Sequence, residues 1–190
     1  MNPFERARGE VVASLASDLQ PIDTPDKTLV VINMQEHFVS PNARHILPTV
    51  CELIEQAKQN NWAIILVQLV YGKGTNICKK ILDAVEGYPH LAFVSKNGMD
   101  GGKQVLDCLR HSPKWSLDLL VCGVFGDQCV AATVEGLLCG SDLVEVSVIQ
   151  DAIYPEYVPF VNAVGHPRQQ IVSITKVEED SVALQANLKS

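Results

Sequence analysis

The chain has 190 residues, 47% of them hydrophobic, with 15 Lys and Arg against 22 Asp and Glu and a formal net charge of −7. This length and apolar content suit one domain with a substantial buried core. The acidic balance argues against nucleic-acid binding, which usually concentrates Lys and Arg on one face of a protein.

The N-terminal segment, residues 1–26, mixes charged and short apolar side chains. We expect it to form a helical arm ahead of a single domain at 27–190. It contains neither the apolar core of a secretory signal nor a spanning run of about 20 apolar residues. The sequence therefore predicts a cytoplasmic protein that does not associate with membranes.

From residue 28 onward, short runs rich in β-branched residues alternate with longer amphipathic segments, which is typical of an α/β fold. Several runs are apolar on both alternating faces, as in strands that are covered by helices on two sides. The expected strands are residues 28–33, 63–70, 91–95, 117–122, 143–149 and 170–175.

The connections between these runs are expected to be mainly helical. One helix begins near Pro48, a residue favoured in the first helical turn, and ends at Asn60. A second follows the glycine pair at 101–102, and a third is expected to begin with Asp127 as its N-cap. A closing helix is expected over 178–188.

Three side chains with chemical potential fall at the carboxyl ends of expected strands, where the ligand sites of parallel sheets collect. Asn33 ends the first strand, Lys96 follows the third, and Cys129 lies at the start of the helix after the fourth. A cysteine near a helix N-terminus and a lysine has a stabilised thiolate, as a nucleophilic sulfur requires. Cys122 and Cys139 are instead interpreted as packing residues.

The six cysteines show no CxxC spacing and no neighbouring histidine pairs. Neither a structural zinc site nor a disulfide framework is therefore expected.

Four segments occur in a specific order: NMQEHF after the first strand, ILPTVCELIEQAKQNNWAIILVQ, the lysine in FVSKNGMD, and CGVFGDQCVAATVEGLLCGSDLVEVSVIQDAI. In this order they resemble the isochorismatase-like cysteine hydrolases, which include nicotinamidases and N-carbamoylsarcosine amidase. The resemblance covers roughly residues 27–176. Its strongest part is the last segment, which matches the family pattern G-V-x-x-D-x-C-V-x-x-T.

The resemblance implies a three-layer α/β/α Rossmann-like fold with a six-stranded parallel sheet in the order 3-2-1-4-5-6. It also implies a catalytic triad of Asp, Lys and Cys, at the positions of Asn33, Lys96 and Cys129. In the family, the cysteine attacks a carbonyl carbon and the Asp shuttles protons. A cis peptide, here Val124–Phe125, would form an oxyanion hole together with the backbone N–H of Cys129.

Asn33 departs from the family pattern, because an amide forms hydrogen bonds but does not accept a proton at ordinary pH. Two other bases stay open. Burial could lower the pKa of Lys96 until its neutral amine accepts the proton, or His37 could serve, since it replaces the second acidic residue of the family motif. The alternative interpretations are that Lys96 is an exposed loop lysine and that His37 is a loop histidine. Phe38 and Phe93 are candidate pocket residues, although core packing explains them equally well.

The expected function is hydrolysis of a small amide or related C–N bond through a covalent Cys129 intermediate. One alternative is a catalytically silent descendant that binds a small molecule or a protein partner. A nucleotide-binding Rossmann protein is less well supported, because no G-x-G-x-x-G follows an expected strand.

No cofactor is expected. Nicotinamidases hold a metal through an Asp-x-His pair after the second strand, and residues 71–90 contain no such pair. The sequence therefore predicts no metal site and disfavours nicotinamide as the substrate. Since family members are often oligomeric, the resemblance is also compatible with a homo-oligomer.

Overall fold

The computed structural model describes residues 24–39, 41–70, 76–160, 164–177 and 179. Six parallel strands form one sheet in the order β3-β2-β1-β4-β5-β6, which confirms the fold class and the strand order. The strands are β1 (Thr28–Ile32), β2 (Ala63–Leu69), β3 (Leu91–Lys96), β4 (Asp118–Val124), β5 (Glu145–Tyr154) and β6 (Gln169–Val172).

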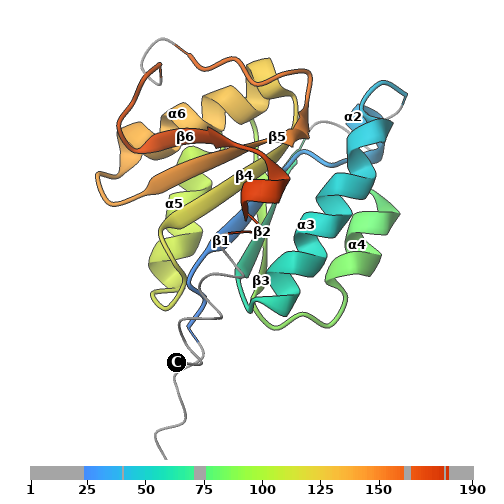
Figure 1. Cartoon of the computed structure of the whole chain (residues 1–190), viewed down its shortest axis with the longest axis horizontal. Helices are drawn as coiled ribbons and strands as arrows, with labels where there is room; N and C mark the ends of the chain where they lie inside the picture. Colours follow the sequence, from blue (N-terminus) through green and yellow to red (C-terminus); the bar gives the residue numbers. More distant parts are fainter. Residues whose placement is uncertain (1–23, 40, 71–75, 161–163, 178, 180–190) are drawn as a thin grey trace, which may run out of the picture.

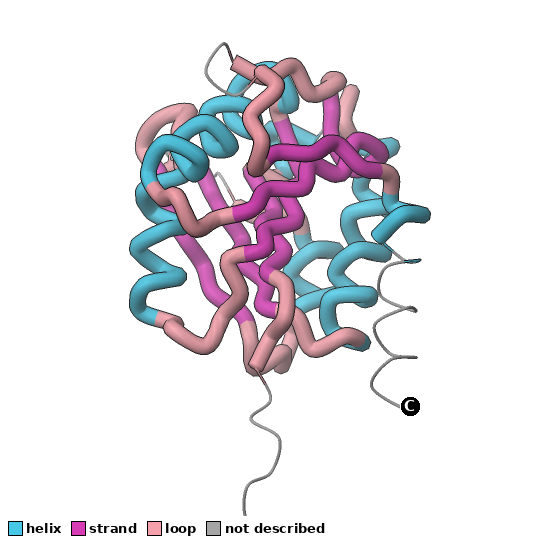
Figure 2. The backbone as a smooth tube through the Cα atoms, turned by 60° about the vertical axis from the view of Figure 1, so that its left-hand side comes forward, coloured by secondary structure: helices cyan, strands magenta, loops and turns pink. Residues whose placement is uncertain are grey.

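Helices cover both faces of the sheet (Figures 1 and 2). Successive strand residues point to opposite faces, so Leu29 and Val31 of β1 join the core under α3 and α4, whereas Val30 and Ile32 join the core under α5 and α6. Burial on two sides explains why β1 is apolar at nearly every position. The helical elements are α2 (Glu36–Val39), the 3₁₀ turn η1 (Arg44–Ile46), α3 (Leu47–Gln59), α4 (Lys79–Val85), α5 (Gly102–His111), the π-helical turn η2 (Gly126–Val130) and α6 (Ala131–Gly140).

The element boundaries differ from the expected ones mainly around β5. This strand continues to Tyr154, because its pairing with β4 contains an irregularity: Val121 pairs with Val148, but Gly123 pairs with Ile153. The extra residues of β5 bulge out of the ladder, and the strand then resumes beyond the expected end at residue 149.

The helix expectations are partly confirmed. Helix α3 has Pro48 in its first turn and Asn60 as its C-cap, and α5 begins directly after Gly101. The prediction that Asp127 is an N-cap is wrong. Asp127 lies inside η2, whose N-cap is Phe125 and which has no capping side chain, because the chain enters α6 through a wider π-helical turn.

The expected N-terminal arm, up to residue 23, and nearly all of the expected closing helix lie outside the described residues. Within the described part of the chain, every helix is too short or too polar to cross a bilayer.

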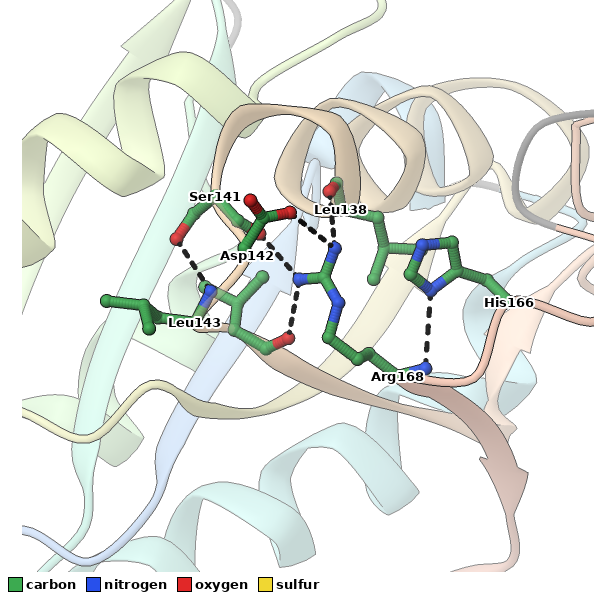
Figure 3. A network of polar contacts seen from close by, with 7 residues as sticks. Leu138, Ser141, Asp142, Leu143, His166 and Arg168 are labelled. Carbon is green, nitrogen blue, oxygen red and sulfur yellow. Dashed lines mark hydrogen bonds and ion pairs between the residues drawn. The ribbon is translucent and has the colours of Figure 1, made fainter.

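The C-terminal end of α6 is held by Arg168, which precedes β6 (Figure 3). Its Nη2 donates to the carbonyl oxygen of Leu138 at 2.9 Å, and its Nη1 donates to those of Ser141 at 2.5 Å and Val144 at 3.1 Å. The last carbonyl groups of a helix lack intrahelical partners. Arg168 therefore supplies donors that the backbone of α6 and its following turn would otherwise lack.

We expect Arg168→Met to lower the free energy of unfolding by about 1–3 kcal/mol, since it leaves partly buried carbonyl groups without a charged donor. Urea denaturation measures this loss. Arg110→Met is the matched control, because Arg110 forms an exposed ion pair with Asp107, and it should change stability little. Equal losses in the two variants would show that the Arg168 contacts contribute no more than a surface ion pair does.

Candidate active site

Cys129 lies in a tightly packed turn at the end of β4. The strand ends at Val124, the Val124–Phe125 peptide bond is cis at the position that the family resemblance implies, and η2 follows. A Cβ at Gly126 would lie 2.1 Å from the carbonyl oxygen of Pro155, so only glycine fits there. The thiol of Cys129 is consequently held in place, with 6% of the residue exposed.

Lys96 is the last residue of β3 and is almost completely buried, with 1% of its surface exposed. Its Nζ donates a hydrogen bond to the carbonyl oxygen of Met99 and interacts with the side chain of Cys129. Burial lowers the pKa of Lys96, because water no longer solvates the ammonium group. The hydrogen bond and charge interaction with Cys129, and then the charge of Asp100, oppose this effect.

The loop after β3 encloses the lysine side chain. A Cβ at Gly101 would lie 3.0 Å from Cδ of Lys96, and the backbone N–H of Gly101 donates to Oγ1 of Thr133 in α6 at 3.0 Å. Asp100 accepts a hydrogen bond from the N–H of Gly102 at 2.6 Å. Sequence reasoning missed the contributions of Thr133 and Asp100 here. The signal that was present is the glycine pair, which permits a close approach of backbone to side chain.

Asn33 follows β1 in the left-handed backbone region, with φ of 54°, which Asn and Asp tolerate better than most residues. Its backbone N–H donates to the carbonyl oxygen of Val67 at 2.8 Å. Its side chain is buried, and within the part of the chain that the structure describes neither Oδ1 nor Nδ2 has a hydrogen-bond partner. The amide therefore bonds to neither Lys96 nor Cys129.

Gln35 holds the tips of β1 and β2 together, a role that sequence reasoning also missed. Its buried amide donates to the carbonyl oxygen of Leu69 at 3.1 Å and accepts from the N–H of the same residue at 2.8 Å. These two hydrogen bonds to the backbone of Leu69 fix the loop that carries Asn33. The glutamine of NMQEHF is thus structural in this chain.

The candidate pocket residues differ in their positions and burial in the structure. Phe38 is half-buried and packs edge-to-face on Phe125, with 5.8 Å between ring centroids, which brings it to the cis peptide. His37 has an exposed side chain whose ring packs on Phe38 at 5.4 Å. It lies in helix α2 rather than in a loop.

Phe93 lies on the face of β3 opposite to Lys96. Phe93 is 54% exposed and borders a groove of about 410 Å³ together with Gln68 and Leu82. It is three residues before Lys96, so the two side chains point to opposite faces of β3. Phe93 faces the α4 side, and Lys96 faces the side of Cys129.

The other cysteines differ from Cys129 in their surroundings. Burial raises the pKa of Cys122 to about 12 and is the largest cause that raises the pKa of Cys78 to about 11. Both thiols are therefore poor nucleophiles. Cys122 packs inside β4 as expected, but the same prediction for Cys139 is wrong, because Cys139 is exposed at the end of α6.

Within the described residues, no three His, Cys, Asp or Glu side chains gather as a metal site would require. Part of the connection after β2 lies outside those residues, so the absence of a metal stays a prediction.

A family model for the isochorismatase domain matches residues 27–154. The chain belongs to the isochorismatase family. Solved structures similar to this family member include an isochorismatase family protein from Desulfovibrio vulgaris, at 18% identity with a TM-score of 0.64, covering 82% of this chain and 97% of that one. The N-carbamoylsarcosine amidase from Thermoplasma acidophilum is 16% identical with a TM-score of 0.63, covering 78% of this chain and 96% of that one.

The nicotinamidase from Staphylococcus aureus is 17% identical to this isochorismatase-family chain with a TM-score of 0.59, covering 68% of this chain and 84% of that one. A comparison with curated protein sequences gives no match. At these identities the structural likeness shows the fold that this family member shares with two amidases.

Titration of Lys96 should be visible in the stability of the protein. Because its folded pKa lies below the ordinary value of 10.5, the unfolded chain binds more protons between the two pKa values, and stability rises with pH across that window. We expect the free energy of unfolding of Cys129→Ala to rise relative to that of Cys129→Ala/Lys96→Met as pH rises toward about 10.5. Urea denaturation at several pH values measures this difference. A pH-independent difference would contradict a lowered pKa.

Proposed function

We propose that this isochorismatase-family protein is a cysteine hydrolase that cleaves a small amide or related C–N bond through a covalent intermediate on Cys129. The observation that carries the proposal is the buried contact between the amine of Lys96 and the thiol of Cys129. A nucleophilic thiol needs a neighbouring base or cation, and Lys96 is placed to be either.

Lys96 is the proton acceptor in this proposal, because the amide of Asn33 cannot take the thiol proton. The lowered pKa of Lys96 raises the fraction of neutral amine that is present near neutral pH. Proton transfer then gives a thiolate beside an ammonium group, which the carbonyl oxygen of Met99 stabilises. The exposed position of His37 disfavours it as the base.

The thiolate attacks the carbonyl carbon of the substrate and forms a C–S bond. The resulting oxyanion is stabilised by backbone N–H groups at Phe125 and Cys129, in the turn that follows the cis peptide. The C–N bond then breaks, and the departing nitrogen takes the proton from the Lys96 ammonium group. This step leaves a thioester and a neutral amine at Lys96.

Water completes the cycle. The neutral amine of Lys96 accepts a proton from the attacking water, the C–S bond breaks, and the thiolate regains a proton from the Lys96 ammonium group. The net reaction consumes one amide and one water and gives a carboxylic acid and ammonia or an amine.

We expect iodoacetamide to label Cys129 faster than Cys139 at pH 7, even though Cys139 is exposed and Cys129 is buried, because the thiolate is the reacting species. Peptide mass mapping after short labelling times measures the two rates. Lys96→Met should slow labelling of Cys129 by at least about tenfold and leave Cys139 unchanged. If Cys139 reacts first, or if the substitution has no effect on Cys129, the activated thiol is refuted.

Restoring the family residue tests the proton transfer. Native activity toward small amides and carbamoyl compounds should increase with pH as Lys96 loses its proton, and Asn33→Asp should move this increase to lower pH and raise the rate by about 10²–10⁴-fold. Steady-state rates from about pH 5 to 10 measure both effects, with Cys129→Ala as the inactive control. Hydrolysis by the Asn33→Asp variant alone would mean that the natural protein is catalytically silent and only binds its ligand.

A further inference from the structure

The side-chain amide of Asn33 is a hydrogen-bonding group without a described function. It is 1% exposed, and both Oδ1 and Nδ2 lack partners among the described residues. Burying an unsatisfied donor and acceptor is costly, and most buried side-chain polar atoms in folded proteins are paired. An unpaired buried amide is therefore a candidate for hydrogen bonding to a ligand.

Asn33 lies at the same edge of the sheet as the proposed reactive centre, because it follows β1, which pairs with β4, and Cys129 lies in the turn after β4. The backbone N–H of Asn33 binds the carbonyl oxygen of Val67. A Cβ built at Gly101 would meet the side chain of Val67 at 3.3 Å and Cδ of Lys96 at 3.0 Å. Lys96 in turn interacts with Cys129. Asn33 is therefore connected to the lysine through Val67 and Gly101.

The backbone conformation does not explain the amide. A φ of 54° favours Asn, Asp or Gly, and glycine would satisfy it without burying two unpaired polar atoms. Asn61 has nearly the same φ, 57°, at the end of α3, but it is only partly buried. The need for a left-handed residue and the presence of a buried unpaired amide are thus separate features of this chain.

We propose that Asn33 is a specificity-determining residue that recognises the amide group of the ligand and discriminates it from the corresponding carboxylate. Nδ2 donates to the ligand carbonyl oxygen, and Oδ1 accepts from the ligand N–H. The carbonyl oxygen has two lone pairs, so a backbone N–H of the oxyanion hole can donate to it as well. This inference rests on the proposed function, since it assigns the substrate amide to the same site.

A carboxylate cannot form this pair. It has two acceptor oxygens and no donor at neutral pH, so it leaves Oδ1 unpaired and places negative charge against it. Sites that hydrogen-bond a ligand group strongly reject analogues without it, because the buried protein group is then left unsatisfied. Asn33 would therefore weaken binding of the acid product, which an aspartate in its protonated form would tolerate.

Binding to a variant that cannot turn over tests the proposal. In a Cys129→Ala background, isothermal titration with benzamide and benzoate, and with acetamide and acetate, should show each amide binding at least about tenfold more tightly than its acid. Adding Asn33→Gly should bring both ratios close to one. Adding Asn61→Gly instead, which changes a residue of the same backbone region away from the site, should leave the ratios unchanged.

Thermal unfolding of the same free proteins supplies a second measurement. If the Asn33 amide serves a ligand, its loss in Asn33→Gly should leave the melting temperature equal to or above that of the Asn61→Gly control. A lower melting temperature would identify a structural amide and overturn the proposal. Absence of any amide binding, or an amide preference that survives Asn33→Gly, would also overturn it. If any of these outcomes overturns the role of Asn33 but Cys129 is still labelled selectively, the proposed hydrolase function stands.

Discussion

The burial of one lysine ammonium group is the constraint on which the rest of this site depends. Lysine is rarely buried unless it is paired, and Lys96 is enclosed at the end of an edge strand. The carbonyl oxygen of Met99 and the sulfur of Cys129 interact with the amine of Lys96. The absence of a side chain at Gly101 leaves room for the lysine stem. Since Asn33 brings no charge, the balance between ammonium and amine depends on these neighbours.

The fold and the chemistry separate clearly in this family member. Its sheet order and helical layers are shared with amidases that differ at more than four of every five aligned residues. The scaffold carries the amide of Asn33 at the tip of β1, and this amide is not a proton acceptor at ordinary pH. Function in such folds resides in the few side chains at the strand ends, so each of these must be argued separately.

Much of this arrangement was predictable from the sequence. Alternating apolar segments indicate the layers, the family motifs imply the strand order, and the strand-end rule brings Lys96 and Cys129 together. The spacing of Phe93 from Lys96 already indicates that their side chains lie on opposite faces of β3. The π-helical entry at Asp127 and the bulge in β5 were not predictable, because they arise from packing between distant segments. The orphaned amide of Asn33 likewise appears only once its surroundings are known.

The two ends of helix α6 are held by different contacts. It begins directly after η2, in which only glycine fits at position 126. At its other end, the carbonyl oxygen of Leu138 accepts a hydrogen bond from the guanidinium group of Arg168. Ten helical residues span about 15 Å and behave as a short stiff rod. Cys129 therefore precedes a helix whose far end is fixed by Arg168, so the position of its thiol depends on contacts at both ends of α6.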